Sequence, residues 1–195
     1  MGDNIMIEVE AQHVKTVLQD IVLFAAPKAD WLPALEGVQV VSADNILTVT
    51  ATNRYIAAYE TISLAVDSAE FDFFIPTDRV KLLVSQIGKS AGNISVREDG
   101  LFLIGCGSVA AGVKTGENGD FPKLPKMMER WDDARGEQRE IRFNPAYLAL
   151  LTKVKPYDAG KTDPLVFELG IGTSSPAKVT RGSFTAYIMP VRRPE

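Results

Sequence analysis

The stretch Phe73-Phe-Ile-Pro-Thr-Asp-Arg-Val80-Lys-Leu-Leu83-Val84-Ser-Gln-Ile87 decides the fold, because two other parts of the chain follow the same pattern. Residues 7–21 and 141–154 also begin as a short alternating strand, pass a turn or cap and continue as an amphipathic helix. Val14, Val80 and Leu148 occupy corresponding positions, 66 and 68 residues apart. A fixed period of this kind predicts a repeat architecture. The alternative is three unrelated strand–helix steps in one α+β domain.

Segments with strand character follow each of the three stretches. They cover residues 35–41, 46–51 and 55–64, then 93–97, 101–106 and 109–115, and finally 164–169, 177–181 and 184–191. Turn chemistry separates them, most clearly at Asp99-Gly100. Each unit therefore reads β-α-β-β-β. The predicted fold class is α+β, with repeated units that place their helices on one face of antiparallel sheets.

The composition changes at Gly116. The eleven residues from Gly116 to Lys126 contain two glycines and two prolines, and a charged stretch follows from Glu129 to Glu140. Such a change is typical of an interdomain linker. We expect a domain of two units at residues 1–122, a linker at 123–139 and a half domain of one unit at 140–195. Thr77 and Asn144 are expected to cap the second and third helices.

The odd number of units has a consequence for assembly. One unit has an apolar sheet face that a single helix cannot cover, so units are expected to pair into domains. The third unit is then expected to lack a mate in its own chain, and an open sheet edge invites another chain. The sequence predicts a head-to-tail oligomer that closes as a ring or continues as a filament.

The expected helices carry most of their charge as cations, although the net charge of the chain is −4. Most acidic residues lie outside these helices, and the cations on them are His13, Lys15, Arg79, Lys81, Lys89, Lys153 and Lys155. One interpretation is that solvated helix faces are simply rich in Lys and Arg. The other is a single positive surface that binds phosphates without regard to base sequence.

The composition argues against an enzyme. Cys106 is the only cysteine and His13 the only histidine, so a His/Cys metal site is excluded. The chain has no glycine-rich phosphate loop, no dinucleotide motif and no G-x-S-x-G motif. We expect no catalytic residue, no metal and no cofactor. The absence of a run of 18 apolar residues predicts no membrane span, and the single cysteine suits the cytoplasm.

Several short motifs occur in a fixed order along the chain, beginning with Thr48-Val-Thr-Ala-Thr52-Asn-Arg54-Tyr and Phe74-Ile-Pro76. These two resemble the "TD-x-x-R-L" loop and the pattern before a helix in the bacterial DNA polymerase III β sliding clamp family. Asp120-Phe-Pro122 resembles the end of one of its domains. Arg142-Phe-Asn-Pro-Ala-Tyr147 is similar to its "FNPKYL" helix start, and Tyr187-Ile-Met189-Pro190-Val-Arg192 to its "MPMR" ending.

The resemblance implies the clamp fold and a DNA polymerase processivity factor, a ring that encircles duplex DNA. The family chain has six units, whereas this chain resembles the family's middle domain followed by the second half of its last domain. A family ring contains twelve units, so the resemblance implies four copies of this chain, or three if residues 123–140 contain a degenerate fourth unit. The seven cations on the expected helices would then face DNA.

The resemblance also implies a pocket that binds short peptides of a polymerase or clamp loader. The residues carried over to it are Thr52, Asn53, Arg54, Tyr55, Pro76, Val80, Val179, Tyr187, Met189, Pro190 and Val191. Ordinary strand and helix packing is the alternative for most of them. Arg54 follows Thr52-Asn53 directly, so this loop is shorter than that of the family.

Two rival functions stay open at this level. The first is a clamp-fold interaction or regulatory module that binds partner peptides without forming a ring. The second is an unrelated α+β enzyme in which the repeat arises by chance. The solution mass separates the first from a ring, and turnover by the purified protein would reveal the second.

Overall fold

The computed structural model describes residues 6–28, 32–65, 68–88, 92–97, 101–104, 107–110, 113–114, 121–122, 124, 141–169 and 175–191. The first unit consists of β1 (Met6–Glu10), α1 (Ala11–Ile21), β2 (Gly37–Ala43), β3 (Ile46–Thr52) and β4 (Ile56–Ser63), with short 3-10 helices at Val22–Phe24 and Pro33–Leu35. Helix α1 buries Val14, Val17, Leu18 and Ile21, the spacing that lines one face of a helix.

The second unit repeats this order. It consists of β5 (Phe71–Pro76), α2 (Thr77–Gln86), β6 (Asn93–Arg97), β7 (Leu101–Ile104) and β8 (Gly107–Ala110), followed by β9 (Val113–Lys114). The expectation of one strand at 109–115 is corrected, because β9 leaves its neighbours and pairs with β5 in the other sheet. The expected cap is also corrected: Thr77 lies inside the helix, and its hydroxyl donates to the carbonyl oxygen of Glu36 at 2.8 Å.

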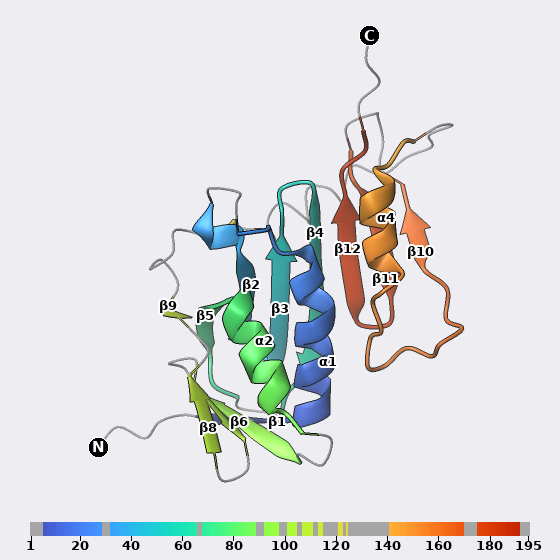
Figure 1. Cartoon of the computed structure of the whole chain (residues 1–195). Coiled ribbons are helices and arrows are strands. Elements are labelled where there is room, and N and C mark those ends of the chain that lie inside the picture. Colours follow the sequence, from blue (N-terminus) through green and yellow to red (C-terminus); the bar gives the residue numbers. More distant parts are fainter. Residues whose placement is uncertain are drawn as a thin grey trace.

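The first two units exchange their first strands. Strand β1 pairs with β6 in a sheet of order β1-β6-β7-β8, whereas β5 pairs with β2 beside β3 and β4. Reciprocal hydrogen bonds mark the exchange, since Ala11 N donates to Gly92 O and Thr77 N donates to Glu36 O, each at 2.9 Å. Helices α1 and α2 consequently lie side by side on the same face (Figure 1). Each of the first two units thus completes the sheet of the other.

The third unit is less complete. It contains α4 (Pro145–Leu151), β10 (Val166–Glu168), β11 (Ala177–Arg181) and β12 (Phe184–Ile188). Asn144 caps α4 as expected, because its Oδ1 accepts a hydrogen bond from Ala146 N at 2.9 Å. The strand expected before the helix is corrected: residues 141–144 form no strand, and the carbonyl oxygen of Arg142 accepts from Val191 N at 2.7 Å instead.

The third unit joins the first through a continuous sheet. Strand β12 pairs antiparallel with β4, from Phe184 opposite Glu60 to Ile188 opposite Ile56, in an eight-stranded sheet of order β10-β11-β12-β4-β3-β2-β5-β9. The third unit therefore has a sheet neighbour in its own chain through β12, whereas the expected lack of a mate concerns its other edge, β10. Helices α1, α2 and α4 all lie on one side of the sheets (Figure 1). A single apolar core runs beneath them, and the rings of Phe24 and Phe184 are 5.5 Å apart across the junction.

Buried carboxyl groups lie at the same junction. Glu60 on β4 is fully buried, and its Oε1 accepts a hydrogen bond from the Ser183 hydroxyl at 3.0 Å. Asp20 on α1 accepts from Lys155 N at 2.6 Å. Burial, with repulsion from Asp20 and Asp158, raises the pKa of Glu60 to about 7, and burial raises the pKa of Asp20 to about 6. The third unit is therefore docked on carboxyl groups that hold a proton in mildly acidic solution.

The stability of the protein is expected to fall as the pH rises from about 4.5 to about 7. An unfolded glutamate loses its proton near pH 4.5, whereas folded Glu60 keeps it up to about pH 7. Within that window the folded state binds more protons, so raising the pH favours unfolding. The expected loss is of the order of 3 kcal/mol in the free energy of unfolding.

Urea unfolding at a series of pH values checks this expectation. The variant Glu60→Gln keeps a neutral hydrogen-bonding group and should remove the part of the pH dependence due to Glu60, while the part due to Asp20 remains. Glu70→Gln, at an exposed glutamate, is the control and should leave it unchanged. A wild-type stability that is constant or rises across the window would contradict the assignment.

Candidate peptide pocket and basic helix face

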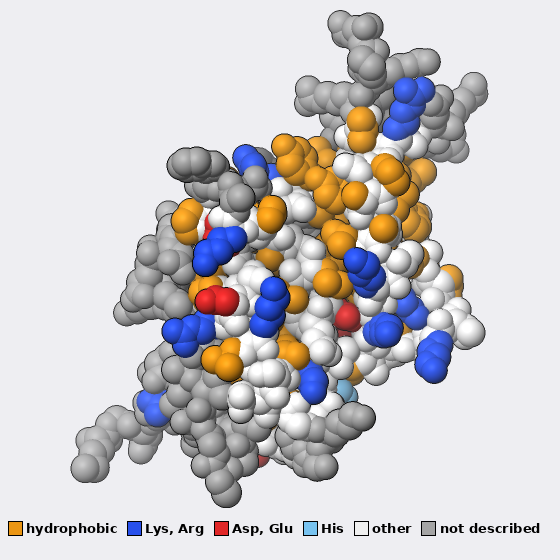
Figure 2. Space-filling view, viewed as in Figure 1, with side chains coloured by type: hydrophobic (Ala, Val, Ile, Leu, Met, Phe, Trp, Pro, Cys, Tyr) orange, Lys and Arg blue, Asp and Glu red, His pale blue; other side chains and the backbone are white. Residues whose placement is uncertain are grey.

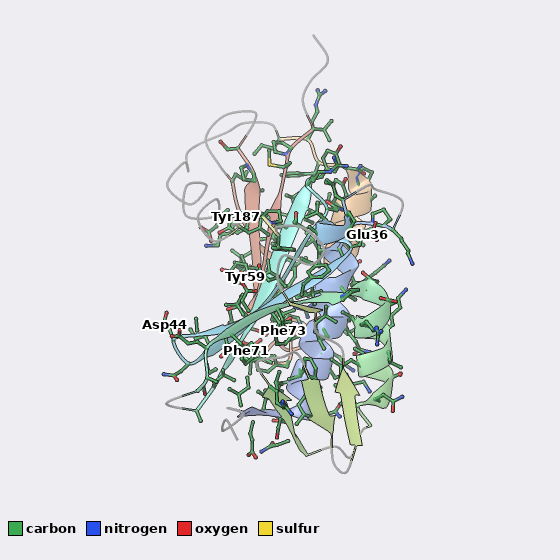
Figure 3. The ribbon with its side chains drawn as sticks, turned by 90° about the vertical axis from the view of Figure 1, so that its left-hand side faces the viewer. Glu36, Asp44, Tyr59, Phe71, Phe73 and Tyr187 are labelled. Atoms are coloured by element: carbon green, nitrogen blue, oxygen red, sulfur yellow. The ribbon has the colours of Figure 1, made fainter. Side chains whose placement is uncertain are left out.

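The eight-stranded sheet has two different faces. Phe184, Ala186 and Ile188 of β12 belong to the core beneath the helices, while the intervening Tyr187 belongs to a separate apolar cluster with Ala57 of β4. Alternate side chains of a strand point to opposite faces, so this cluster lies on the side away from the helices. Figure 3 shows Tyr187 and Tyr59 on that side. Phe121 and Leu124 join the cluster and cover part of the sheet.

The loop between β3 and β4 holds its shape through its own hydrogen bonds. The Thr52 hydroxyl donates to the carbonyl oxygen of Ile56 at 2.9 Å and accepts from Arg54 N at 3.1 Å. Asn53 Oδ1 accepts from the backbone N–H groups of Tyr55 and Ile56, both at 3.1 Å. Arg54 consequently takes a left-handed conformation with φ of 77°. This geometry presents Arg54 and Tyr55 to solvent as exposed side chains.

A cavity of about 300 Å³ opens between this loop, the end of β12 and the segment after residue 120. Its lining residues are Thr52, Arg54, Tyr55, Ile56, Ala57, Pro122, Leu124, Tyr187 and Met189. The backbone joins the two sides, because Met189 N donates to Tyr55 O at 2.9 Å. The structure thus brings together five residues that the sequence assigned to a peptide pocket: Thr52, Arg54, Tyr55, Tyr187 and Met189.

The other residues assigned to this pocket lie elsewhere. Val80 and Val179 are buried in the core, with exposed fractions of 1% and 0%. Pro76 lines a second cavity at the start of α2. Asn53 braces the loop, and Pro190 and Val191 follow Met189 without lining the cavity. The structure therefore does not bring these six residues into one pocket with the first five.

Sequence reasoning missed Ile56, Ala57, Pro122 and Leu124. A signal for the last two was present, since the motif Asp120-Phe-Pro122 was noted as the end of a domain. Apolar residues inside a segment rich in glycine and proline indicate that the segment packs on a surface rather than hanging free. Leu124 is only 3% exposed, which confirms that part of the segment is packed.

The pocket combines an apolar floor with aromatic and basic edges. The Tyr55 side chain is 54% exposed, and its ring stacks on that of Tyr147 with centroids 6.2 Å apart. The Arg54 guanidinium lies 5.9 Å from the Tyr55 ring, and the Lys178 ammonium lies 5.9 Å from the Tyr187 ring. Ligand sites of this type bury apolar groups and use a few polar groups for orientation. An extended peptide with one or two apolar anchors fits this chemistry.

The basic residues lie on the opposite, helical side. Arg79 and Lys81 on α2, and Lys153 and Lys155 just after α4, are all exposed. Figure 2 shows Lys and Arg side chains spread over this side, with few acidic side chains among them. Lys15 is half-buried, and its Nζ donates to Ile87 O at 2.7 Å, so it also fastens α1 to the end of α2. Lys89 lies outside the described residues.

His13 has a different environment from the other cations. Its ring lies 4.2 Å from that of Tyr157, and its Nε2 is 3.3 Å from Glu10 Oε2. A side chain held by an aromatic ring and a carboxylate contributes less to a phosphate-binding surface than an exposed lysine. The four exposed cations on or next to α2 and α4 are therefore the strongest candidates on this face.

A second cavity, of about 640 Å³, lies where α2 begins. Lys28, Arg79 and Lys81 line it together with Glu36 and Asp78. The mixture of charges gives it no clear preference for one class of ligand. Among the described residues, no group of three or more His, Cys, Asp or Glu side chains is placed to hold a metal ion. No helix in the described part of the chain is long and apolar enough to cross a membrane.

Solved structures of DNA polymerase sliding clamps share this architecture along the whole chain. The Thermotoga maritima DNA polymerase III β subunit has a TM-score of 0.75 at 15% identity, covering 100% of this chain and 67% of that one. The Pseudomonas aeruginosa clamp has a TM-score of 0.76 at 14% identity, covering 99% and 68%. The Bartonella birtlesii clamp bound to griselimycin has a TM-score of 0.69 at 12% identity, covering 99% and 66%.

No protein-family model matches the sequence, and a search of curated proteins finds no match. The structural likeness nevertheless defines the class of fold. The chain has the α+β fold of the DNA polymerase sliding clamps, as its sequence motifs predicted. More particularly, it has the architecture of the DNA polymerase III β subunit, in a chain that aligns with about two thirds of that protein.

Proposed function

We propose that this protein is a DNA polymerase processivity factor. Copies of the chain form a ring around duplex DNA, and the ring tethers a polymerase and other partners through the pocket beside Tyr55 and Met189. The single observation that carries the proposal is the division of the clamp fold into two faces, one with helices and exposed cations and one with the apolar pocket. The function needs no catalytic residue and no cofactor, so the chain is proposed not to be an enzyme.

The helical face suits a duplex that must slide. Exposed Arg79, Lys81, Lys153 and Lys155 belong to two different helical segments on the same side of the sheets. Contacts from such side chains to phosphates are independent of base sequence and weaken as salt increases. A surface of this kind holds DNA without fixing the protein at one position, which a processivity factor requires.

The pocket suits a tether. A polymerase segment that binds there stays close to the primer end while the ring stays on the DNA. Its effective local concentration rises although the clamp carries out no chemistry. The proposed partners are therefore double-stranded DNA, a polymerase and a clamp loader that each present a short peptide, and further copies of this chain.

Griselimycin is the ligand chosen to test the pocket, because a structurally similar clamp from Bartonella birtlesii was solved bound to it. We expect it to bind this protein and the variant Met189→Asp to bind at least about 30-fold more weakly, the loss typical of a central interface residue. Met189 lines the cavity, and a carboxylate there would be buried against apolar ligand groups. Isothermal titration calorimetry measures both affinities.

Ile46→Asp is the matched control for this experiment. Ile46 is an exposed apolar residue at the start of β3, at the opposite end of that strand from Thr52. It should leave the affinity unchanged. Equal affinities for wild type and Met189→Asp would show that the ligand binds elsewhere.

A further inference from the structure

One of the two edges of the eight-stranded sheet, among the described strands, is an apolar strand. Strand β10 is the last strand on its side of the sheet. Val166, Phe167 and Leu169 are 51%, 42% and 36% exposed, and they are three of the eight exposed large apolar side chains in the described residues. Figure 2 shows hydrophobic side chains gathered over the C-terminal unit around α4. An exposed apolar edge strand is a template for pairing with another strand.

The first two units show which strand pairs with the outer edge of a strand in the position of β10. Strand β10 corresponds to β2 and β6, the first strands after the helix in their units. Each of those is covered by the first strand of the other unit, β5 on β2 and β1 on β6. The register is the same in both cases, because the residue directly before the helix lies opposite the first residue of the covered strand. These pairs are Glu10 with Asn93 and Pro76 with Gly37.

The third unit has both halves of this arrangement, but among the described residues no strand pairs with residues 141–144 or with the outer edge of β10. Residues 141–144 precede α4, as β1 and β5 precede their helices, yet they form no strand. Strand β10 pairs only with β11 among the described strands. The unit therefore offers one segment that could cover a strand and one strand that requires cover.

We propose that a second copy of this chain completes the third unit by reciprocal strand exchange. Residues 141–144 of each copy pair with β10 of the other, as the first strands of units one and two do within the chain. The shared register places Asn144 opposite Val166, Phe143 opposite Phe167 and Arg142 opposite Glu168. The aromatic pair and the opposite charges are both favourable across antiparallel strands. The contact is isologous, with the same surface on both copies.

This contact changes how a ring would close, and in that respect the inference rests on the proposed function. Among the described strands, the two sheets end on β10 and β9 and on β1 and β8. Strand β8 is the last strand of its unit after the helix and hairpin, as β4 and β12 are of theirs. Within the chain, last strands pair with each other, as β12 does with β4. Strands β8 and β10 are thus edges of different kinds, and strands of these two kinds do not pair with each other across units in the described part of the chain. Pairing of like edges replaces the head-to-tail contact expected from the sequence. Alternating like contacts close only rings with an even number of chains, and four chains of three units supply the twelve units of a family ring.

A cysteine cross-link tests the exchange. In full-length protein carrying Cys106→Ser, we expect Phe143→Cys/Phe167→Cys to form disulfides under mild oxidation, because the register sets these residues directly opposite each other. A reciprocal contact uses both disulfides within one pair of copies, so cross-linking stops at the covalent dimer on a non-reducing gel. A head-to-tail contact through the same residues links each chain to two neighbours and gives a longer ladder, which would overturn the proposal.

Phe143→Cys/Ile46→Cys is the matched control and should give no covalent dimer. Ile46 is as exposed as Phe167, but it lies on β3, which takes no part in the proposed contact.

Charge exchange gives a second test that leaves the core untouched. Arg142→Glu should weaken assembly at least about tenfold, and Arg142→Glu/Glu168→Arg should restore it if the two side chains meet across the contact. Failure of the double variant to restore assembly would overturn the register.

The outcomes separate this inference from the proposed function. If the wild type assembles but the Phe143→Cys/Phe167→Cys variant forms no disulfide, the contact lies elsewhere. That result overturns the inference, while the proposed ring survives. A covalent dimer in a protein that fails to stimulate a polymerase supports the inference and contradicts the proposed function. A wild type that stays monomeric at every concentration contradicts both.

Discussion

The variant Lys81→Glu/Lys153→Glu is expected to lose its stimulation of DNA synthesis while its solution mass stays unchanged. Both side chains are exposed, one on α2 and one just after α4, on the side of the sheets where all three helices lie. Two glutamates there would repel phosphates that the lysines attract. Neither residue belongs to the sheet edges at which copies are proposed to meet, so assembly should persist.

The salt dependence of DNA binding gives the sharpest measurement of this variant. Each lost phosphate contact should reduce the slope of log K against log salt by about one, so the double variant should lose about two. Lys178→Glu is the control, because Lys178 lies beside Tyr187 on the opposite face. An unchanged slope, or full stimulation of a polymerase by the double variant, would contradict the assignment of the helical face to DNA.

Phe184→Ala is expected to have the largest effect on stability. Phe184 is fully buried in β12, and its ring packs 5.5 Å from that of Phe24 in the first unit. Removal of a buried phenyl group loses its transfer free energy and leaves a cavity, for a total cost of about 3–5 kcal/mol. Because this ring lies at the junction of the first and third units, the loss should fall on the docking of the third unit.

Urea unfolding of Phe184→Ala and of the control Ile46→Ala checks this cost. Ile46 is 42% exposed, and its truncation should change the free energy of unfolding by no more than about 0.5 kcal/mol. If the two variants lose equal stability, the third unit is not docked through this core. Separate unfolding of the third unit in Phe184→Ala, visible as a second transition, would agree with the expected location of the damage.

The repeat was readable from the sequence because it rests on local patterns. The helical stripe of Val14, Val17 and Leu18 and the cap at Asn144 each follow from a few neighbouring residues, and the structure confirms them. The exchange of β1 and β5 could not be predicted from the sequence. Alternation in a strand indicates which residues are buried, but it does not indicate which strand pairs with it. The same holds for the pairing of β12 with β4.

The corrected details have local physical causes. Thr77 does not cap α2, because its hydroxyl and backbone N–H both donate to Glu36 O and so serve the junction between two strands. Residues 141–144 have the sequence of a strand, but a strand needs a neighbour, and the described part of the chain supplies none. The odd number of units predicted that a mate is missing, but the local pattern of these residues does not show that the strand fails to form without it.

The candidate pocket was predicted in part for a similar reason. Thr52, Arg54, Tyr55, Tyr187 and Met189 lie in two short segments whose backbones are hydrogen-bonded, so they converge. Val80 and Val179 occupy the inward side of a helix and of a strand, and their burial in the core is a matter of register. To predict their burial, one must know which side of the helix and which side of the strand face the core, and the motifs do not specify this.

Light scattering across a concentration series tests the central claim, the ring, most directly. We expect a stable species of four chains, with four times the 21.3 kDa mass of one chain, over a wide range of concentrations. A stable species of three chains would keep a ring and contradict the pairing of like edges. A monomer at every concentration would contradict the ring itself and leave a clamp-fold module that binds peptides without enclosing DNA.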